Sequence, residues 1–459
     1  MLNKKILSFV CIFLSLGLVA CTASPTPLPA TTAATTDPIE TIEPVELVVY
    51  YLESDPNSSQ IVTAFDSSES AYTVDAVGFS SVDEIDAAIA SVLDTDDAPD
   101  VILFPNSTKL DTFKLAAEGA FLNLSSWLDW DMVYSSGDYY PLFNCGQIAG
   151  EQLLIPLRFQ LLHYITSTEK IESTDLTLPE YYTASELMSA LISNAETRSD
   201  YESALQLLSP NSPGGLLYDH LRLSGIDIST PDNQARVLQD DIFEEYAHYL
   251  QTAIEEILTS EMILKAYQTD FKSAVSRLTT MLSTDSLAYN MRYYDALFSQ
   301  CLEESVQILP LTDYQIPNNL TVDVSVYAAV SANTNHPEEA YQFIRYAMDA
   351  AIGVFDNDLS IRKASVASLL DDLSHSEGET INTGEHKVTV NKMSDDIRTD
   401  CEDLLNRIAA GSIRNNAIKV IFDSAMNDYL YGKASYSDSY SALCNQLDQY
   451  LQYPDINEH

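Results

Sequence analysis

Basic residues are scarce in this chain. Its 459 residues include 23 Lys and Arg against 68 Asp and Glu, which gives a formal net charge of −45. A surface of this sign repels nucleic acid and anionic lipid headgroups, because both carry dense negative charge. We therefore expect no nucleic-acid partner, although the charge says little about the fold.

The sequence also lacks the short motifs of common catalytic and metal sites. It has no HExxH, GxGxxG, GxSxG or Walker motif and no CxxC pair. An SxxK match at Ser167–Lys170 lacks the companion triplets of serine acyl-enzymes, and Asp94–Asp100 has Pro99 where a calcium loop needs glycine. The seven histidines are scattered. We therefore predict that the chain is not an enzyme and expect no catalytic residue, cofactor or bound metal.

The chain has one short apolar run, at its start, and none later that is long enough to span a membrane. Lys4 and Lys5 precede the apolar stretch 6–20, and the sequence Leu-Val-Ala-Cys then ends at Cys21. This arrangement resembles the lipobox of bacterial lipoproteins and is too short to cross a bilayer comfortably. We predict that residues 1–20 are a lipoprotein signal peptide and that Cys21 carries the lipid. An ordinary signal peptide with an incidental cysteine is the alternative.

Residues 21–44 are rich in Thr and Pro. No Lys or Arg occurs between Thr22 and Pro44. Such a composition cannot bury enough apolar surface to fold, and proline favours an extended chain of about 3.1 Å per residue. We predict a disordered tether that holds the remaining chain at the outer face of a bacterial cell membrane through its lipid anchor.

Four cysteines remain beyond the lipid site, far apart in the sequence. They are Cys145, Cys301, Cys401 and Cys444. Outside the cell they could form disulfides in three connectivities, or they could remain thiols. The sequence leaves both possibilities open.

The pattern after the tether alternates between strand and helix. Val45–Glu53 is rich in β-branched and aromatic residues, Ala71–Phe79 has a similar pattern, and Ala98–Pro105 is a short apolar run ending at proline. Between the last two, Ser81 can cap a helix whose apolar residues follow helical spacing: Val82, Ile85, Ile89 and Val92. This rhythm predicts an α/β fold with a parallel sheet.

Helical patterns dominate the later chain, from Ala184 to about Gln300 and again at Thr334–Ala351. In the latter segment Asn335 or His336 can cap the helix, and Pro337 suits its first turn. Acidic residues follow at the positive end of the helix dipole. One apolar stripe is then predicted to face the core: Ala340, Phe343, Ile344, Ala347 and Met348.

Five stretches, taken in order, resemble a known family. They are APDVILFPNSTKLDTFKLAAEGAFLNLSSWLD (98–129), GEQLLIPLRFQLLHYITS (150–167), VQILPLTDYQIP with VYAAVSANTNHPEEAYQFIRYAMD (306–349), LSIRKASV (359–366) and IKVIFDSAMNDYLYGKASYSDSYSALCNQLDQYL (418–451). Their order and spacing resemble those of the extracellular solute-binding lipoproteins of ABC importers, the sugar-type family that includes maltose-binding protein.

This resemblance implies an α/β, two-lobed periplasmic-binding-protein-like fold with hinge crossover strands. The N-lobe would be 45–155 plus 326–374, and the C-lobe 156–325 plus 375–459. A small solute, expected to be a carbohydrate or oligosaccharide, would bind in the interlobe cleft and pass to ABC permease subunits. The crossovers would lie near Ile155–Tyr164 and Thr321–Val330.

Aromatic residues are the first candidates for contact with such a solute, because Tyr and Trp combine a flat apolar face with a polar group. The chain has 27 Tyr and two Trp. Most of these side chains could equally pack in the core. The candidates are Trp127, Trp130, Tyr164, Tyr218, Tyr289 and Tyr293.

Arg158 is a further candidate, since it is a rare basic residue inside the first crossover. It could donate forked hydrogen bonds to a solute, or it could pair with a neighbouring acid and stiffen the hinge.

One segment departs from the family pattern. Phe271–Met281 reads FKSAVSRLTTM, without the glycine turn that many members place before the return crossover. A second hypothesis therefore stands beside solute import. A surface lipoprotein of the same fold could act as a partner-binding or sensor module without transport.

Overall fold

The computed structural model describes residues 45–66, 72–169, 172, 186, 213–226, 228, 241–257, 283–286, 289–312, 316, 318–350, 358–376, 378–382 and 387–451. All of these residues belong to one compact unit, Pro44–His459. The predicted signal peptide, the tether and the segment 271–281 lie outside the described residues.

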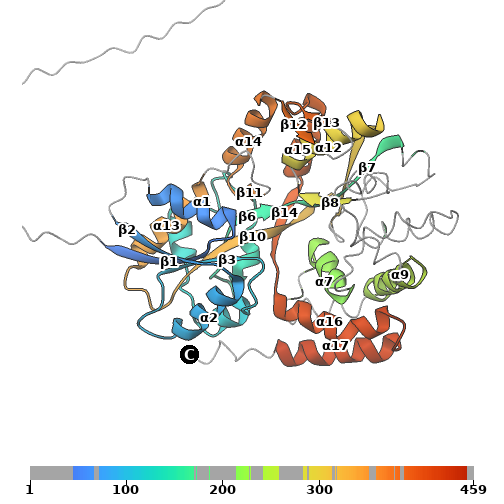
Figure 1. Cartoon of the computed structure of the whole chain (residues 1–459). Helices are drawn as coiled ribbons and strands as arrows, with labels where there is room; N and C mark the ends of the chain where they lie inside the picture. The colour runs from blue at the N-terminus through green and yellow to red at the C-terminus, as the bar shows by residue number, and fades with distance from the viewer. Residues whose placement is uncertain are drawn as a thin grey trace, which may run out of the picture. The chain divides into compact units, whose positions relative to one another are not determined.

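Among the described residues, seven strands form the largest sheet (Figure 1). Its main path is β11-β6-β10-β3-β1-β2, and β14 pairs with β10 beside that path. β1 is parallel to β2 and β3, whereas β10 is antiparallel to β3 and β6. The carboxyl ends of β1, β3 and β6 therefore meet at one edge. The strands are β1 (Glu46–Leu52), β2 (Thr73–Phe79), β3 (Val101–Pro105), β6 (Ile155–Gln160), β10 (Leu320–Val330), β11 (Leu359–Ser360) and β14 (Ile408–Ile413).

Helices cover both faces of this sheet (Figure 1). Val101 and Leu103 of β3 pack in the core on one face, and Ile102 and Phe104 pack in the core on the other. All five residues of β3 are buried, as the continuous apolar run predicts for a strand covered on both sides. The first face carries α1 (Pro56–Asp66) and α13 (Pro337–Asp349), and the second carries α2 (Val82–Val92) and α3 (Thr112–Ala117).

The sequence-based predictions for the strands and helices of this layer are confirmed. The hydroxyl of Ser81 accepts a hydrogen bond from the Glu84 N–H at 3.3 Å and caps α2. Pro337 begins α13, but the side chain of His336 at the N-cap makes no capping hydrogen bond. The predicted apolar stripe of α13 is buried: Ala340, Phe343, Ile344, Ala347 and Met348.

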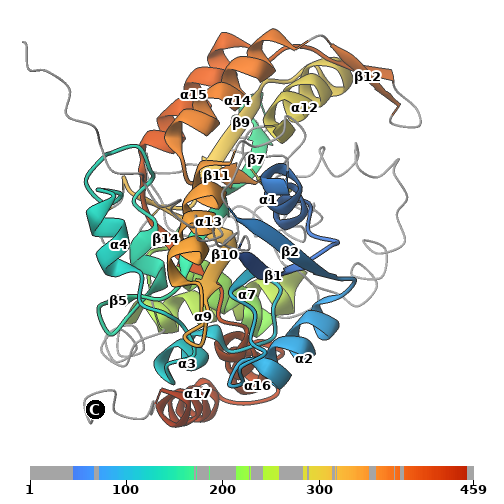
Figure 2. The same ribbon diagram turned by 90° about the vertical axis from the view of Figure 1, so that its left-hand side faces the viewer.

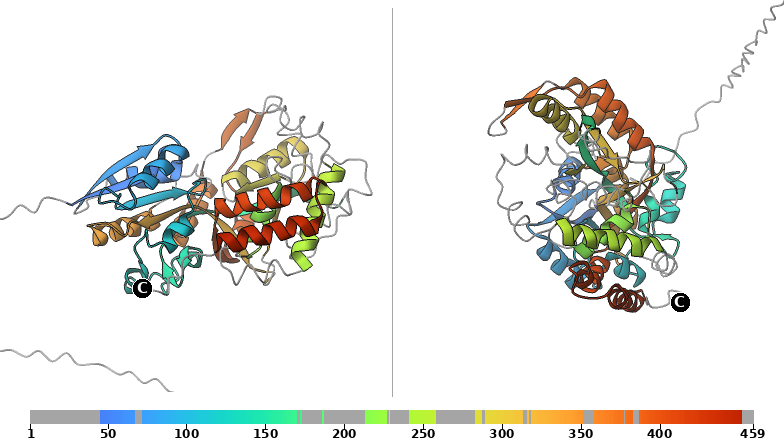
Figure 3. Two further views of the ribbon diagram at one scale, coloured as in Figure 1. Left: turned by 90° about the horizontal axis from the view of Figure 1, so that it is seen from below. Right: turned by 90° about the vertical axis from the view of Figure 1, so that its right-hand side faces the viewer.

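A separate core joins four helices from the middle and the end of the chain. Figure 3 shows two of them, α16 and α17, side by side. The helices are α7 (Pro213–Leu223), α9 (Asp241–Ile257), α16 (Asn416–Leu430) and α17 (Tyr436–Tyr450). A small antiparallel sheet has the order β8-β7-β9, with β7 (Leu162–Ser167), β8 (Ser283–Ser286) and β9 (Val306–Pro310).

A third group of helices packs together near a hairpin (Figure 2). The buried side chains of this group belong to the same core as the α1 and α13 face of the large sheet. The group consists of α12 (Tyr289–Leu297), α14 (Lys363–His375) and α15 (Asp395–Asn406), with the hairpin strands β12 (Glu379–Asn382) and β13 (Lys387–Val390).

The chain crosses twice between the two sheets. It leaves the large sheet at the end of β6 and enters the small one at β7, one residue later. It returns from β9 to β10, the long strand that pairs with β6, β3 and β14. Both predicted crossovers are therefore present. The exact lobe boundaries stay predictions. β14 belongs to the predicted C-lobe but pairs with β10 in the large sheet.

Two further points concern the cysteines and the membrane. Disulfides do not join Cys145, Cys301, Cys401 or Cys444. Within the described ranges, no helix has both the length and the apolar character that crossing a membrane requires.

Candidate ligand site

A pocket of about 520 Å³ lies at the edge of the large sheet where β1, β3 and β6 end. Its volume is in the range of small-molecule sites. In α/β proteins ligands bind at the carboxyl ends of the strands, because loops there bring polar groups together from several segments. The pocket is lined by Leu52, Ser54, Asp55, Pro56, Asn57, Val82, Pro105, Asn106, Ser107, Gln160, Ser325 and Asp358.

Asp55 is fixed at the pocket wall by the start of α1. Its Oδ2 accepts hydrogen bonds from the backbone N–H of Ser58 at 2.9 Å and from the Ser58 hydroxyl. An Asp in this position, followed by Pro56, is a favourable beginning for a helix. The positive end of the helix dipole also stabilises the carboxylate.

Asp358 is the most enclosed carboxylate of the pocket, with 6% of its surface exposed. Gln160 Nε2 donates to its Oδ1 at 2.5 Å, and Asn57 Nδ2 donates to its Oδ2 at 2.7 Å. Burial raises the pKa of Asp358, and the nearby Asp55 and Asp323 raise it further, against the lowering effect of Ser325 and Gln160. The described residues include no ion-pair partner for this carboxylate within 4.0 Å.

Two buried oxygens of the lining have no hydrogen-bond partner within the described parts of the chain. They are Asn57 Oδ1 and Ser325 Oγ, although the Ser325 hydroxyl lies close enough to Asp358 to lower its pKa. The two residues are 7% and 5% exposed, respectively. A buried polar atom without a partner is costly, because it has lost its hydrogen bonds to water. The pocket therefore has room for hydrogen-bond donors supplied by a ligand.

The described lining contains no Lys, Arg, His or aromatic side chain. It also offers no group of three or more metal-ligating residues, and none occurs elsewhere in the described ranges. The polar side chains of the lining carry carboxylates, amides and hydroxyls, which are groups that bind a polar, hydrogen-bonding solute.

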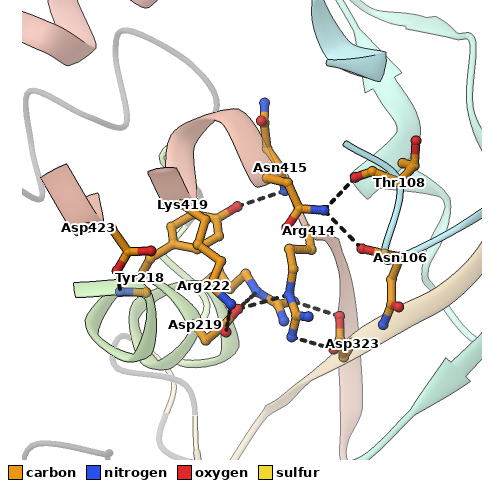
Figure 4. Close-up of polar contacts among 12 residues, drawn as sticks. Asn106, Thr108, Tyr218, Asp219, Arg222, Asp323, Arg414, Asn415, Lys419 and Asp423 are labelled. Carbon is orange, nitrogen blue, oxygen red and sulfur yellow. Dashed lines mark hydrogen bonds and ion pairs between the residues drawn. The ribbon is translucent and has the colours of Figure 1, made fainter. Parts of the chain in front are cut away.

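A second polar cluster lies where β10 meets α7 (Figure 4). Arg222, at 3% exposure, donates from Nε to Asp219 Oδ1 and from Nη1 to Asp323 Oδ1, both at 2.8 Å. Arg414, which follows β14, lies within 3.1 Å of Asp219 Oδ1 and 3.4 Å of Asp323 Oδ2. We call Asp219, Arg222, Asp323, Arg414 and Lys419 the paired cluster.

Cations decide the ionisation of Asp219 in the paired cluster. Burial by itself would raise its pKa, but Arg222, Arg414 and Lys419 together lower it to about 2. The Lys419 Nζ lies 3.5 Å from Asp219 Oδ2. Asp219 is therefore a firmly ionised structural carboxylate, unlike Asp358.

Backbone carbonyls join the paired cluster to the pocket (Figure 4). Asn416 Nδ2, at the start of α16, donates to the carbonyl of Asn106 at 3.2 Å and to that of Thr108 at 2.5 Å. Asn106 also lines the pocket. The loop after β3 therefore contacts both the pocket and the helix that carries Lys419.

Arg158 is not at a cleft surface. It is fully buried and donates from Nη1 to the carbonyls of Leu157 and Ala347 at 2.8 and 3.3 Å, and from Nη2 to that of Ala350 at 3.3 Å. The last two carbonyls belong to the end of α13, where a cation is stabilised by the helix dipole. The guanidinium therefore contacts the end of α13, which packs over β6. Whether Arg158 also contacts a solute or pairs with an acidic side chain stays a prediction.

The two tryptophans lie on α4 (Ser125–Trp130), away from the described pocket. Trp127 is half-buried and stacks on Tyr341 with ring centroids 5.8 Å apart. Trp130 is 86% exposed. Whether either contacts a solute stays a prediction.

The candidate tyrosines do not line the described pocket either. Tyr218 is buried in the core of α7, and its hydroxyl accepts from the Asn415 N–H at 2.9 Å. Tyr293 is half-buried on α12 beside Tyr294. The side chains of Tyr164 in β7 and Tyr289 in α12 lie outside the described part, so their roles stay predictions.

Sequence reasoning missed the residues that build the pocket. Asp55 and Asn57 follow β1 directly, and that position at the carboxyl end of a strand was the available signal. Asp323, a single acid inside the apolar strand β10, was the corresponding signal for the paired cluster. Asp358 offered no signal in its local sequence.

Comparisons with known proteins find relatives by structure only. No family model and no curated protein matches the chain. A sugar transporter from Rhizobium etli in an open conformation matches with a TM-score of 0.57 and 14% identity, over 88% of this chain and 99% of that chain. A cyclic α-maltosyl-1,6-maltose binding protein from Arthrobacter globiformis has the same TM-score and identity, over 89% and 99%.

A third structure agrees with these two. The sugar-binding protein MalE from Xanthomonas citri matches with a TM-score of 0.55 and 11% identity, over 89% of this chain and 97% of that chain. At such identities the likeness establishes the fold. Together with the two crossovers, it shows that this chain has the two-lobed α/β fold of periplasmic binding proteins.

Proposed function

We propose that this protein is a membrane-anchored extracellular receptor for a small polar solute. It captures the solute, a carbohydrate or oligosaccharide, between its lobes and delivers it to an ABC permease. The observation that carries the proposal is the pocket at the carboxyl ends of β1, β3 and β6, where carboxylate, amide and hydroxyl groups converge.

The similar structures support the ligand class. Those from Rhizobium etli and Xanthomonas citri are named as a sugar transporter and a sugar-binding protein, and that from Arthrobacter globiformis as a binding protein for a cyclic oligosaccharide. All three names describe binding or transport, in agreement with the prediction that this chain is not an enzyme. Sugars carry many hydroxyl groups, and the acceptors of the lining can accept hydrogen bonds from them.

Membrane attachment rests on the sequence around Cys21. A lipid on this cysteine and the Thr/Pro-rich segment after it would keep the receptor near its permease. Changing Cys21→Ala should abolish incorporation of labelled fatty acid and release the protein from membranes. Equal labelling of the variant would refute this attachment.

A thermal-shift screen against oligosaccharides and peptides tests solute binding. A ligand at a hundred times its dissociation constant adds about 2.7 kcal/mol to the free energy of unfolding. Gln160→Ala should reduce the shift, because Gln160 lines the pocket and holds Asp358. Gln342→Ala, on the exposed side of α13, is the matched control and should not.

The alternative is a partner-binding or sensor module of the same fold. Small-angle scattering separates the two functions, because a solute that contacts both lobes favours the closed state and should reduce the radius of gyration. Tight solute binding without compaction, or compaction only with a protein partner, would favour the module.

A further inference from the structure

The described lining of the pocket contains acceptors and negative charge without compensating cations. Asp55 and Asp358 both line it, and the described residues pair neither with Lys, Arg or His. Only 6% of the surface of Asp358 is exposed, so water can solvate little of its carboxylate. A buried carboxylate is normally paired, because moving a charge out of water is expensive.

The neutral groups of the lining add to this imbalance. Asn57 Oδ1 is a buried acceptor without a partner. The hydroxyl of Ser325 lies beside Asp358, whose pKa it lowers, and can also accept a hydrogen bond. The amide donors of Asn57 and Gln160 are already directed at Asp358. Around Asp358 a solute therefore meets mainly acceptors, whereas Ser54, Asn106 and Ser107 elsewhere in the lining can donate as well.

The nearest cations in the described chain cannot supply the missing charge. Arg222 and Arg414 lie close to Asp323 on β10, which also influences Asp358. Both guanidinium groups bind Asp219 and Asp323 instead. The described residues therefore leave the compensating charge to be supplied by a ligand.

From this geometry we propose that the pocket selects a sugar carrying a protonated amine, with the ammonium group placed against Asp358 and Asp55. This inference rests on the proposed function and specifies its solute class. An ammonium group supplies three donors and one positive charge, and a charge-assisted hydrogen bond is roughly twice as strong as a neutral one. The sugar hydroxyls would occupy the acceptors of Asn57 and Ser325.

The charge of the whole chain acts in the same direction. A net charge of −45 raises the local concentration of cationic solutes and lowers that of anionic ones. Capture of a cationic sugar should therefore be fast at low ionic strength and slower in high salt.

Three disaccharides that differ only in the substituent on carbon 2 of each ring provide the test. The β-1,4 disaccharide of glucosamine, its N-acetylated counterpart and cellobiose carry an ammonium, a neutral amide and a hydroxyl at the same carbon. Calorimetric titration of the full chain in near-neutral buffer should show the amine binding at least about tenfold more tightly than the other two. A simple diamine without hydroxyls should bind more weakly than the amino sugar.

Asp358→Asn keeps the shape of the side chain and removes its charge. This variant should lose the preference for the amine and retain cellobiose binding. Asp96→Asn, an exposed acid in the turn after α2, is the control and should leave the preference unchanged.

The outcomes separate this inference from the function on which it rests. Equal affinities for the three sugars, or tighter binding of cellobiose, would overturn the amino-sugar inference and leave the sugar receptor standing. If the diamine bound most tightly, neither the proposed sugar receptor nor the amino-sugar inference would hold, because the sugar hydroxyls would contribute nothing to binding. A preference for the amine that persists in Asp358→Asn would overturn the placement against Asp358.

Discussion

Two groups of buried carboxylates lie near each other in this protein and differ in what surrounds them. In the paired cluster, three cations hold the pKa of Asp219 down to about 2. In the pocket, burial raises the pKa of Asp358, and amides are its hydrogen-bond partners. Burial of a carboxylate by itself does not reveal its role. The presence or absence of cations distinguishes a structural group from one that awaits a ligand.

The paired cluster should be the more sensitive of the two to loss of one member. Arg222→Met leaves Asp219 and Asp323 buried with one cation fewer, and we expect the free energy of unfolding to fall by about 3–5 kcal/mol. Urea denaturation monitored by circular dichroism measures this. Arg398→Met, which removes a more exposed ion pair on α15, is the control and should have much less effect. Similar losses for both variants would contradict the structural role of the paired cluster.

Neutralising one carboxylate in each group should have the second-largest effect on stability, and the effect should differ between the paired cluster and the pocket. Asp219→Asn should lower the free energy of unfolding by roughly 2 kcal/mol, the value of its pKa shift from 3.8 to about 2. Asp358→Asn should leave stability at neutral pH unchanged or raised, since it removes a carboxylate that burial disfavours. Denaturant titrations of the two variants side by side provide the measurement. A larger loss for Asp358→Asn would reverse the comparison.

The pH dependence of stability should have opposite signs for these two residues. The contribution of Asp219 is present above its unfolded pKa of 3.8 and is lost as the pH falls toward its folded pKa of about 2. The folded pKa of Asp358 is raised, so its ionisation disfavours the folded state and this penalty grows as the pH rises through that pKa. Thermal unfolding of both Asn variants across acidic to neutral pH should show these opposite differences from the unchanged chain. Parallel profiles would contradict the assignment.

Breaking the contact between the paired cluster and the pocket should have the smallest effect on the free energy of unfolding. Asn416→Ala removes donors to the carbonyls of Asn106 and Thr108 and should cost about 1 kcal/mol. Asn391→Ala, at an exposed turn, is the control. We expect the Asn416 variant to weaken solute binding slightly as well, because Asn106 lines the pocket. Unchanged stability would show that the loop after β3 is held by other contacts.

Local patterns were sufficient to predict the layer around the pocket. The apolar run of β3 and the helical stripe of α13 are visible in the sequence, because the period of buried residues is a property of each element alone. The two crossovers were implied by the resemblance of longer motifs to the solute-binding family. The fold was therefore largely predictable before the structure was known.

The pocket was not predictable in the same way, because its contacts join distant segments. Asn57 and Asp358 are 301 positions apart, and no local pattern relates them. Arg158 shows the same limit, since an Arg in an apolar strand does not reveal that the end of α13 lies above it. Sequence reasoning singled out Arg158 and did not foresee its contact with the end of α13.

In this account Asp219 and Asp323 have a structural role because arginines neutralise them. Asp358 binds the solute because no cation among the described residues pairs with it. Calorimetric titration of Asp219→Asn and Asp358→Asn with the glucosamine disaccharide, at a temperature where both are folded, tests this claim most directly. We predict that Asp219→Asn binds the disaccharide like the unchanged chain, although it is less stable. Asp358→Asn should be as stable as the unchanged chain and bind at least about tenfold more weakly. Full affinity in Asp358→Asn, or lost affinity in a folded Asp219→Asn, would contradict the claim.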